Sequence, residues 1–178
     1  MPQTDLAQRL LADVTRAAEN GATLEEAMSG ALRVLGELTG FELGQVWRPS
    51  PNGRALRCEP AAYHAREPER LAPFRRVSLP LAFSFNEGLI GKSWSLGEPV
   101  WLEDVAQEYF VRGPKALAVG LKSGFAFPVK SGPHVLAVYE LLTTRSQPAP
   151  TELIQVLGPL AVRLGEVFGR KPAGVARA

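Results

Sequence analysis

Glu140 is the polar residue whose position in the sequence most strongly suggests a chemical role. It lies between Tyr139 and Leu141, inside an otherwise apolar run that is typical of a buried strand. Burying a carboxylate there is costly unless a partner compensates its charge. Four roles are therefore open: an ion pair with an arginine or lysine, bonds from backbone N–H groups, contact with a ligand, or exposure to solvent on an edge strand. We favour the solvent-exposed edge strand.

Covalent catalysis has little support in the sequence. The chain has one cysteine, Cys58, in an expected strand. A thiol-based redox cycle needs a nucleophilic and a resolving cysteine, and one residue cannot supply both. Ser93 and Ser95 have no histidine or aspartate partners that would suggest an activated hydroxyl. We predict no catalytic residues and a protein that is not an enzyme.

Metal, phosphate and nucleic-acid sites are equally poorly supported. The two histidines, His64 and His134, lie far apart in turn-like positions, and no cluster has zinc-site spacing. We predict no metal site, although a lone axial histidine for haem stays open, and the cofactor is unknown. A net charge of +2 gives no electrostatic footprint for nucleic acid. No signal peptide or apolar run of about 18 residues occurs, so we expect no membrane partner and a cytoplasmic location.

The segment Phe83–Val105 organises the elements around these residues. Asn86-Glu87-Gly88 is typical of a turn, and the apolar spacing after it predicts a short helix that Gly97 ends. Glu98-Pro99 turns the chain, and Val100–Leu102 predicts a short strand. A short helix with so much aromatic surface requires a sheet to pack against.

The remaining elements follow from periodicity and turn residues. Asp5–Asn20 and Thr23–Gly40 carry apolar stripes with helical spacing, and Thr23 with Glu26 forms a capping box. Alternation and turns predict two hairpins; His64–Pro73 predicts a loop or short helix; and Phe74–Phe85, which contains Pro80, predicts an edge-like or irregular strand. The first expected hairpin pairs Phe41–Arg48 with Ala55–Tyr63, and the second pairs Lys122–Lys130 with Val135–Thr144. Between them, Ala106–Ala118 is an expected loop with a short helical piece. The expected final helix is Thr151–Gly169, and Pro159 inside it predicts a kink or a late start.

Several glycine and aromatic positions together resemble the GAF domain, a sensory module of signalling proteins. The resemblance rests on Gly88-Leu-Ile-Gly91, Trp94, Gly97-Glu98-Pro99-Val100-Trp101 and Asp104-Val105, and it continues through Gly120–Val129 and Val135–Leu141. It covers the chain from about Leu24 to Phe168. It implies an α+β fold: a central, mainly antiparallel sheet of about five or six strands, amphipathic helices on one face, and a short helix plus loops on the other.

The resemblance also implies a site for a small molecule between the sheet and the short-helix layer. The residues expected to bind this unknown ligand are Phe83, Phe85, Asn86, Leu89, Trp94, Trp101, Phe110, Phe125, Phe127, Tyr139 and Glu140. The alternative, that these aromatic side chains only fill the core, stays open. Covalent attachment of a chromophore is excluded, because family members that do this use a cysteine in the irregular layer and Cys58 lies elsewhere.

The terminal helices are the expected route of a signal. In the family, such helices pair between subunits and continue into an output domain, so a homodimer and a signalling output protein are possible partners. The expected organisation is an N-terminal helix over residues 1–22, a GAF-like domain over 23–169 and a disordered tail over 170–178. The expected function is a non-catalytic sensor, and the alternative is a ligand-free module for dimerisation or interaction.

Overall fold

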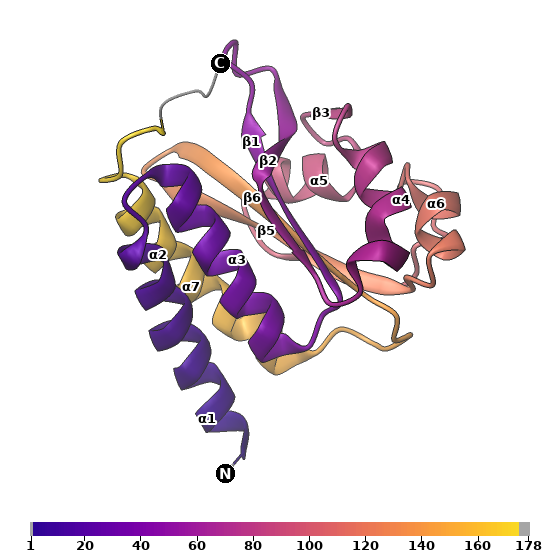
Figure 1. Ribbon diagram of the computed structural model, residues 1–178, viewed down its shortest axis with the longest axis horizontal. Helices are drawn as coiled ribbons and strands as arrows, with labels where there is room; N and C mark the ends of the chain where they lie inside the picture. Colours follow the sequence, from indigo (N-terminus) through magenta and orange to yellow (C-terminus); the bar gives the residue numbers. More distant parts are fainter. Residues whose placement is uncertain (1, 175–178) are drawn as a thin grey trace.

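A six-stranded antiparallel sheet divides the molecule into two layers. The computed structural model describes residues 2–174, with side chains from residue 5 onward, and within this range the strand order is β3-β2-β1-β6-β5-β4 (Figure 1). The strands are β1 (Leu43–Pro49), β2 (Ala55–Ala65), β3 (Ala82–Ser84), β4 (Val100–Leu102), β5 (Ser123–Ser131) and β6 (His134–Thr143). The two predicted hairpins are β1–β2 and β5–β6, and they meet through the pairing of β1 with β6 at the centre of the sheet.

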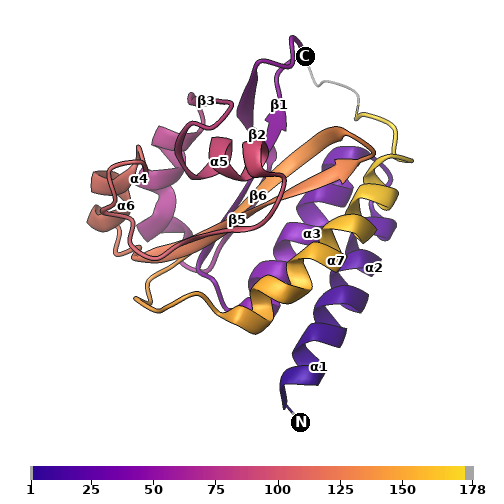
Figure 2. The same cartoon turned by 180° about the vertical axis from the view of Figure 1, so that it is seen from behind.

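The long amphipathic helices cover one face of this sheet. They are α1 (Pro2–Arg9), continued through the π-helical segment η1 (Leu10–Val14) into α2 (Thr15–Asn20), then α3 (Leu24–Thr39) and α7 (Thr151–Phe168). Figure 2 shows α7 and α3 side by side against the sheet, with the α1–α2 helix packed outside them. Their apolar stripes and the sheet form one continuous hydrophobic core.

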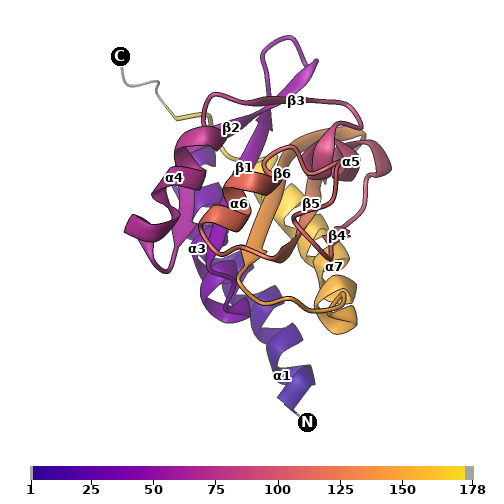
Figure 3. The same ribbon diagram turned by 90° about the vertical axis from the view of Figure 1, so that its right-hand side faces the viewer.

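Three shorter helices cover the opposite face. They are α4 (Pro68–Ser78), α5 (Gly88–Leu96) and α6 (Gly113–Ala118), and together with the segments that join them they form what we call the outer layer (Figure 3). A second, separate cluster of buried side chains lies between this layer and the sheet. The fold therefore has the α+β arrangement that the sequence predicts.

Local sequence signals fix the ends of several helices. The Thr23 hydroxyl accepts a hydrogen bond from the Glu26 backbone N–H at 3.2 Å, as expected for a helix cap. Gly97 ends α5 in the left-handed conformation, with φ of 69°, which confirms its predicted role.

The prediction of an irregular strand over Phe74–Phe85 is wrong for its first half. The helix α4 runs to Ser78, and only Ala82–Ser84 pairs as the short edge strand β3. Leu71, Phe74 and Ser78 are buried at spacings of three and four residues, so helical periodicity outweighs the strand-like alternation of the residues after Val77. Pro68 lies in the first helical turn, where its missing N–H costs nothing.

The C-terminal segment consists of the helix α7 and of residues after it that contact the N-terminal helices. The helix α7 begins at Thr151 and continues through Pro159, so of the two expected effects of this proline, a kink or a late start, the late start does not occur. In the expected disordered tail, the Lys171 ammonium donates to the Glu19 carbonyl at 2.7 Å and the Gly174 N–H to the Glu25 carboxylate at 2.6 Å. The rest of that tail, residues 175–178, lies outside the described residues.

Two glycines of α7 provide a matched test of how closely this helix packs on the sheet. A Cβ at Gly165 would overlap the Lys130 carbonyl oxygen of β5, whereas a Cβ at Gly158 would meet no atom within 4 Å. We expect Gly165→Ala to destabilise the fold by about 1–3 kcal/mol, because the helix must move away from the strand. We expect Gly158→Ala to be neutral or to stabilise by up to about 1 kcal/mol, because alanine favours helix. Urea unfolding of both variants measures the difference, and equal effects would contradict this packing.

Candidate functional site

The strand β6 places its side chains alternately in the two layers. Val138 and Leu142 belong to the cluster under the outer layer, and Tyr139 and Leu141 belong to the core under the long helices. Glu140, between them, therefore points toward the outer layer. It lies directly opposite Gln45 of β1 at the centre of the sheet.

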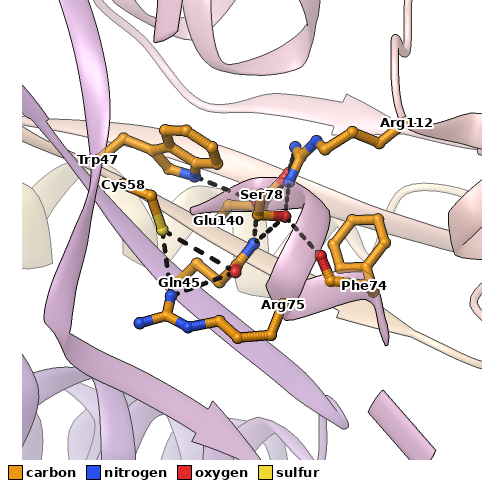
Figure 4. Close-up of polar contacts among 8 residues, drawn as sticks. All are labelled: Gln45, Trp47, Cys58, Phe74, Arg75, Ser78, Arg112 and Glu140. Carbon is orange, nitrogen blue, oxygen red and sulfur yellow. Dashed lines mark hydrogen bonds and ion pairs between the residues drawn. The ribbon is translucent and has the colours of Figure 1, made fainter. Parts of the chain in front are cut away.

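Glu140 is fully buried and bound by three side-chain donors. Its Oε2 accepts hydrogen bonds from Arg112 Nη1 at 3.1 Å, Gln45 Nε2 at 3.1 Å and Trp47 Nε1 at 3.2 Å, and its Oε1 pairs with Arg112 Nη2 (Figure 4). The prediction that Glu140 faces solvent on an edge strand is wrong, because β6 is an inner strand. The other open possibility, an ion pair with an arginine, is the one the structure adopts.

Ser78, at the end of α4, joins the same network. Its Oγ accepts from Arg112 Nη1 at 2.9 Å and from Gln45 Nε2 at 3.2 Å, and it donates to the Phe74 carbonyl at 2.9 Å. The network thus connects two central strands with α4 and with the residue before α6. Its members are almost completely removed from water, since Arg112 is 4% exposed and Gln45 and Ser78 are 0% exposed.

Four aromatic rings surround the guanidinium of Arg112. The distances from Arg112 Cζ to the ring centroids are 4.9 Å for Phe74, 5.0 Å for Phe110, 5.1 Å for Trp47 and 5.3 Å for Phe83. All four lie within the range of cation–π attraction. We refer to these four rings together with the Glu140 carboxylate as the cation cage. Arg112 Nε is the one nitrogen of the guanidinium that is buried without a partner.

The sequence predictions place only part of this site correctly. Phe83, Leu89, Phe110 and Glu140 do lie between the sheet and the outer layer. Trp94 is half-buried at the edge of the same cluster. Phe85 and Asn86 lie on the outside of the layer, and Phe85 is 62% exposed with its ring against Trp94 at 5.4 Å.

Four predicted ligand-binding residues lie on the wrong face for that site. Phe125, Phe127 and Tyr139 stack in series under the long helices, with ring centroids 6.1 and 5.3 Å apart, and Trp101 packs on the edge of the same core. Alternation along β5 and β6 fixes their common face but not which layer covers it. The structure assigns them to the helix-covered core.

Arg112, Trp47, Gln45, Phe74 and Ser78 were not identified from the sequence. One signal was available: Gln45 is a polar residue in an apolar strand, as Glu140 is, and the two strands are central partners. No comparable signal marks Arg112, which lies in an irregular segment with charged residues nearby.

Cys58 borders the network but is poorly suited to nucleophilic chemistry. Burial raises the pKa of its thiol to about 11, although Arg75 Nη1 lies 3.1 Å from the sulfur and opposes this shift. We expect the native protein to react with iodoacetamide at pH 8 about a hundredfold more slowly than the urea-unfolded chain. The reason is that a thiol pKa about two units higher lowers the fraction of Cys58 present as thiolate about a hundredfold. The rate is measured by mass spectrometry. Equal rates in the folded and unfolded protein would show a reactive thiol.

The described part of the chain contains no set of side chains that could bind a metal ion. Residues 2–174 contain no group of three or more histidine, cysteine, aspartate or glutamate side chains placed to hold a metal ion. The His64 Nε2 lies 3.2 Å from the Phe41 carbonyl oxygen, and its ring lies against α3, away from the outer layer.

None of the helices within residues 2–174 is both long and apolar enough to cross a membrane.

Solved structures of similar fold include GAF domains and methionine sulfoxide reductases. The GAF domain of a phosphoenolpyruvate-protein phosphotransferase (ptsP) from Coxiella burnetii superposes with a TM-score of 0.75 at 16% identity, covering 95% of each chain. The nlh2 GAF domain of A. aeolicus, in an inactive state, superposes with a TM-score of 0.71 at 20% sequence identity, and the match covers 94% of this chain and 98% of that one. The free methionine-R-sulfoxide reductase of Neisseria meningitidis, in complex with its substrate, superposes with a TM-score of 0.70 at 17% sequence identity, and the match covers 92% of this chain and 88% of that one. At these identities the likeness establishes the fold.

Sequence comparison identifies the family. No curated protein sequence matches the chain. The family model of the GAF domain matches residues 21–168, a range that contains the central sheet, the outer layer, the helices α3 and α7 and the whole network around Glu140. This protein therefore belongs to the GAF domain family, whose members are generally sensory or regulatory modules.

Proposed function

We propose that this domain is a regulatory module that binds a small molecule between the sheet and the outer layer, at a site centred on Glu140. The observation that carries the proposal is the fully buried Glu140 carboxylate with side-chain donors from Gln45, Trp47 and Arg112. Binding pockets combine apolar walls with a few placed polar groups, and this arrangement has both.

The energetics of buried ion pairs support a functional reading. Replacing such a pair by apolar side chains of similar volume is often neutral or even stabilising, so stability alone gives little reason for Arg112 and Glu140 to be there. The surrounding side chains also supply almost every hydrogen bond that the carboxylate needs. A fully satisfied polar network can also rigidify a core. What supports a recognition site is the place of this network, between the sheet and the outer layer and enclosed by aromatic side chains.

A short physical route connects this site to the terminal helices. Tyr139, the residue next to Glu140 on β6, donates its hydroxyl to the Met28 carbonyl of α3 at 2.9 Å. Its ring stacks on Phe168 of α7, with centroids 6.3 Å apart and planes at 14°. A ligand that repositions β6 at Glu140 would change these contacts and so favour one arrangement of the helices. The proposal includes a contact of these helices with a second subunit or with an output protein, and Leu6 and Val162, exposed on α1 and α7, are available for it.

A second function, a ligand-free module for dimerisation or interaction, is favoured by one observation. The centre of the outer-layer site is filled by the chain's own Arg112, enclosed by four aromatic rings. In this alternative Arg112 never leaves, and the network serves only the specificity of the fold.

The proposal also states that the domain is regulatory, is not an enzyme and acts in the cytoplasm. The raised pKa of Cys58 disfavours a nucleophilic thiolate of the kind that a redox enzyme requires. A lone free cysteine is typical of proteins in a reducing compartment.

A thermal-shift screen of small metabolites, followed by calorimetry, tests the proposed function. A ligand that binds the folded protein raises its melting temperature, by an amount that grows with concentration over the dissociation constant. We expect at least one compound to stabilise the protein at micromolar concentration. A library broad in charge and size from which no compound binds would favour the ligand-free module.

A further inference from the structure

We propose that the ligand of this site is a cation of the guanidinium or amine type, and that it binds by taking the place of the Arg112 side chain in the cation cage. This inference rests on the proposed function and names its ligand class. In this account Arg112 is an internal occupant of a site built for a positive charge.

Charge balance is the first argument. In the described structure the buried site contains one carboxylate, Glu140, and one partner cation, Arg112, which forms two bonds to it. A neutral or anionic molecule that displaced Arg112 would leave Glu140 buried without a counter-charge, which is strongly unfavourable. A cation that displaced it would leave the buried charge unchanged. Arg112, once released to water, recovers its own hydration.

The walls of the site are the second argument. Trp47, Phe74, Phe83 and Phe110 all lie with ring centroids 4.9–5.3 Å from the guanidinium carbon. Aromatic rings arranged around one point, with a carboxylate beside them, attract flat or alkylated cations and give no such advantage to anions. Ser78 Oγ and Glu140 Oε2 both accept from Arg112 Nη1, so acceptors are in place for an N–H-bearing ligand.

The position of Arg112 in the chain is the third argument, because exchange requires that it can leave. It is the N-cap residue of the six-residue helix α6, and its neighbour Val111 is 56% exposed. The segment before it is held by single-turn hydrogen bonds, such as Phe110 N–H to the Gln107 carbonyl. A surface hollow of about 260 Å³ lies beside this segment, lined by Gln107, Phe110, Val111, Gly113, Pro114 and Leu117 among others. The buried Arg112 Nε, which has no partner, lowers the cost of moving the side chain out.

Chemical rescue tests the cage directly. Arg112→Ala removes an ethylguanidinium-sized group, so we expect a lowered melting temperature that millimolar ethylguanidinium restores by several degrees. Ethylurea, neutral and of the same shape, should restore nothing. The double variant Arg112→Ala/Glu140→Gln should lose the rescue, and Arg75→Ala, which removes a half-buried arginine that does not touch Glu140, should show none. Equal stabilisation by ethylurea, or rescue that persists without Glu140, would overturn the proposal.

Exchange in the native protein is the second readout, and it stands even where Arg112→Ala fails to fold. Ethylguanidinium, agmatine and butylamine are titrated against ethylurea and acetate while the ¹⁵N resonance of Arg112 Nε is followed. We expect the cations alone to shift it and to speed its exchange with water, with Glu140→Gln weakening their binding by roughly 10–100-fold. A neutral or anionic ligand that needs Glu140, with no cation bound, overturns the cation class but leaves the proposed function intact. Absence of any binding, from these probes and from the broad metabolite library, contradicts both.

Discussion

Glu140→Ala is expected to destabilise the domain by about 3–5 kcal/mol, because it leaves the Arg112 guanidinium buried without its counter-charge. Arg112 is only 4% exposed, so little water reaches it to compensate for the loss. Arg112→Ala should cost a similar amount for the converse reason. Urea unfolding at constant pH measures both losses.

The double variant Arg112→Met/Glu140→Gln distinguishes a coupled pair from two independent core residues. It removes both charges together, keeps much of the volume, and retains a side-chain oxygen as acceptor for Trp47 Nε1, which donates to Glu140 at 3.2 Å in the native protein. We expect it to lose less stability than either charge deletion alone, since neither charge is then stranded. The single variants Arg112→Met and Glu140→Gln complete the double-mutant cycle, and a double loss equal to the sum of these two single losses would contradict the pairing described here.

Phe127→Ala is expected to destabilise the domain by about 3–5 kcal/mol as well, but for a reason unrelated to the site. Phe127 is fully buried under the long helices, stacked against Tyr139 with centroids 5.3 Å apart, and truncation leaves a cavity in that core. Thermal and urea unfolding measure the loss.

Phe127→Leu then separates stability from binding. The substitution is small enough for the domain to stay folded, and Phe127 lies on the face of the sheet opposite to the cation cage. We expect a moderate loss of stability with ligand affinity unchanged. A large change in affinity would return Phe127 to the ligand site, where the sequence predicts it.

Sequence reasoning recovers the fold well where a local signal exists. Helical periodicity and caps give α3 and α5 correctly, and turn residues between alternating runs give both hairpins. It fails at α4, where alternation after Val77 suggests a strand although Leu71, Phe74 and Ser78 have helical spacing. Both patterns are present in the sequence, and only tertiary packing decides between them.

The candidate site is harder to predict, because its residues come together through tertiary contacts. Alternation groups Phe125 with Phe127, but it cannot say which layer covers their side of the sheet. Arg112 and Glu140 are 28 residues apart, and their pairing depends on how the segment before α6 folds back over β6. The one sequence signal of the site is a pair of polar residues, Gln45 and Glu140, each in an otherwise apolar central strand.

Calorimetric titration of a stabilising metabolite into three proteins is the most direct test of a ligand site centred on Glu140. The proteins are the native domain, Glu140→Gln and Phe127→Leu. The account predicts that binding is lost or strongly weakened in Glu140→Gln and unchanged in Phe127→Leu. Equal affinity in the native protein and in Glu140→Gln would contradict it.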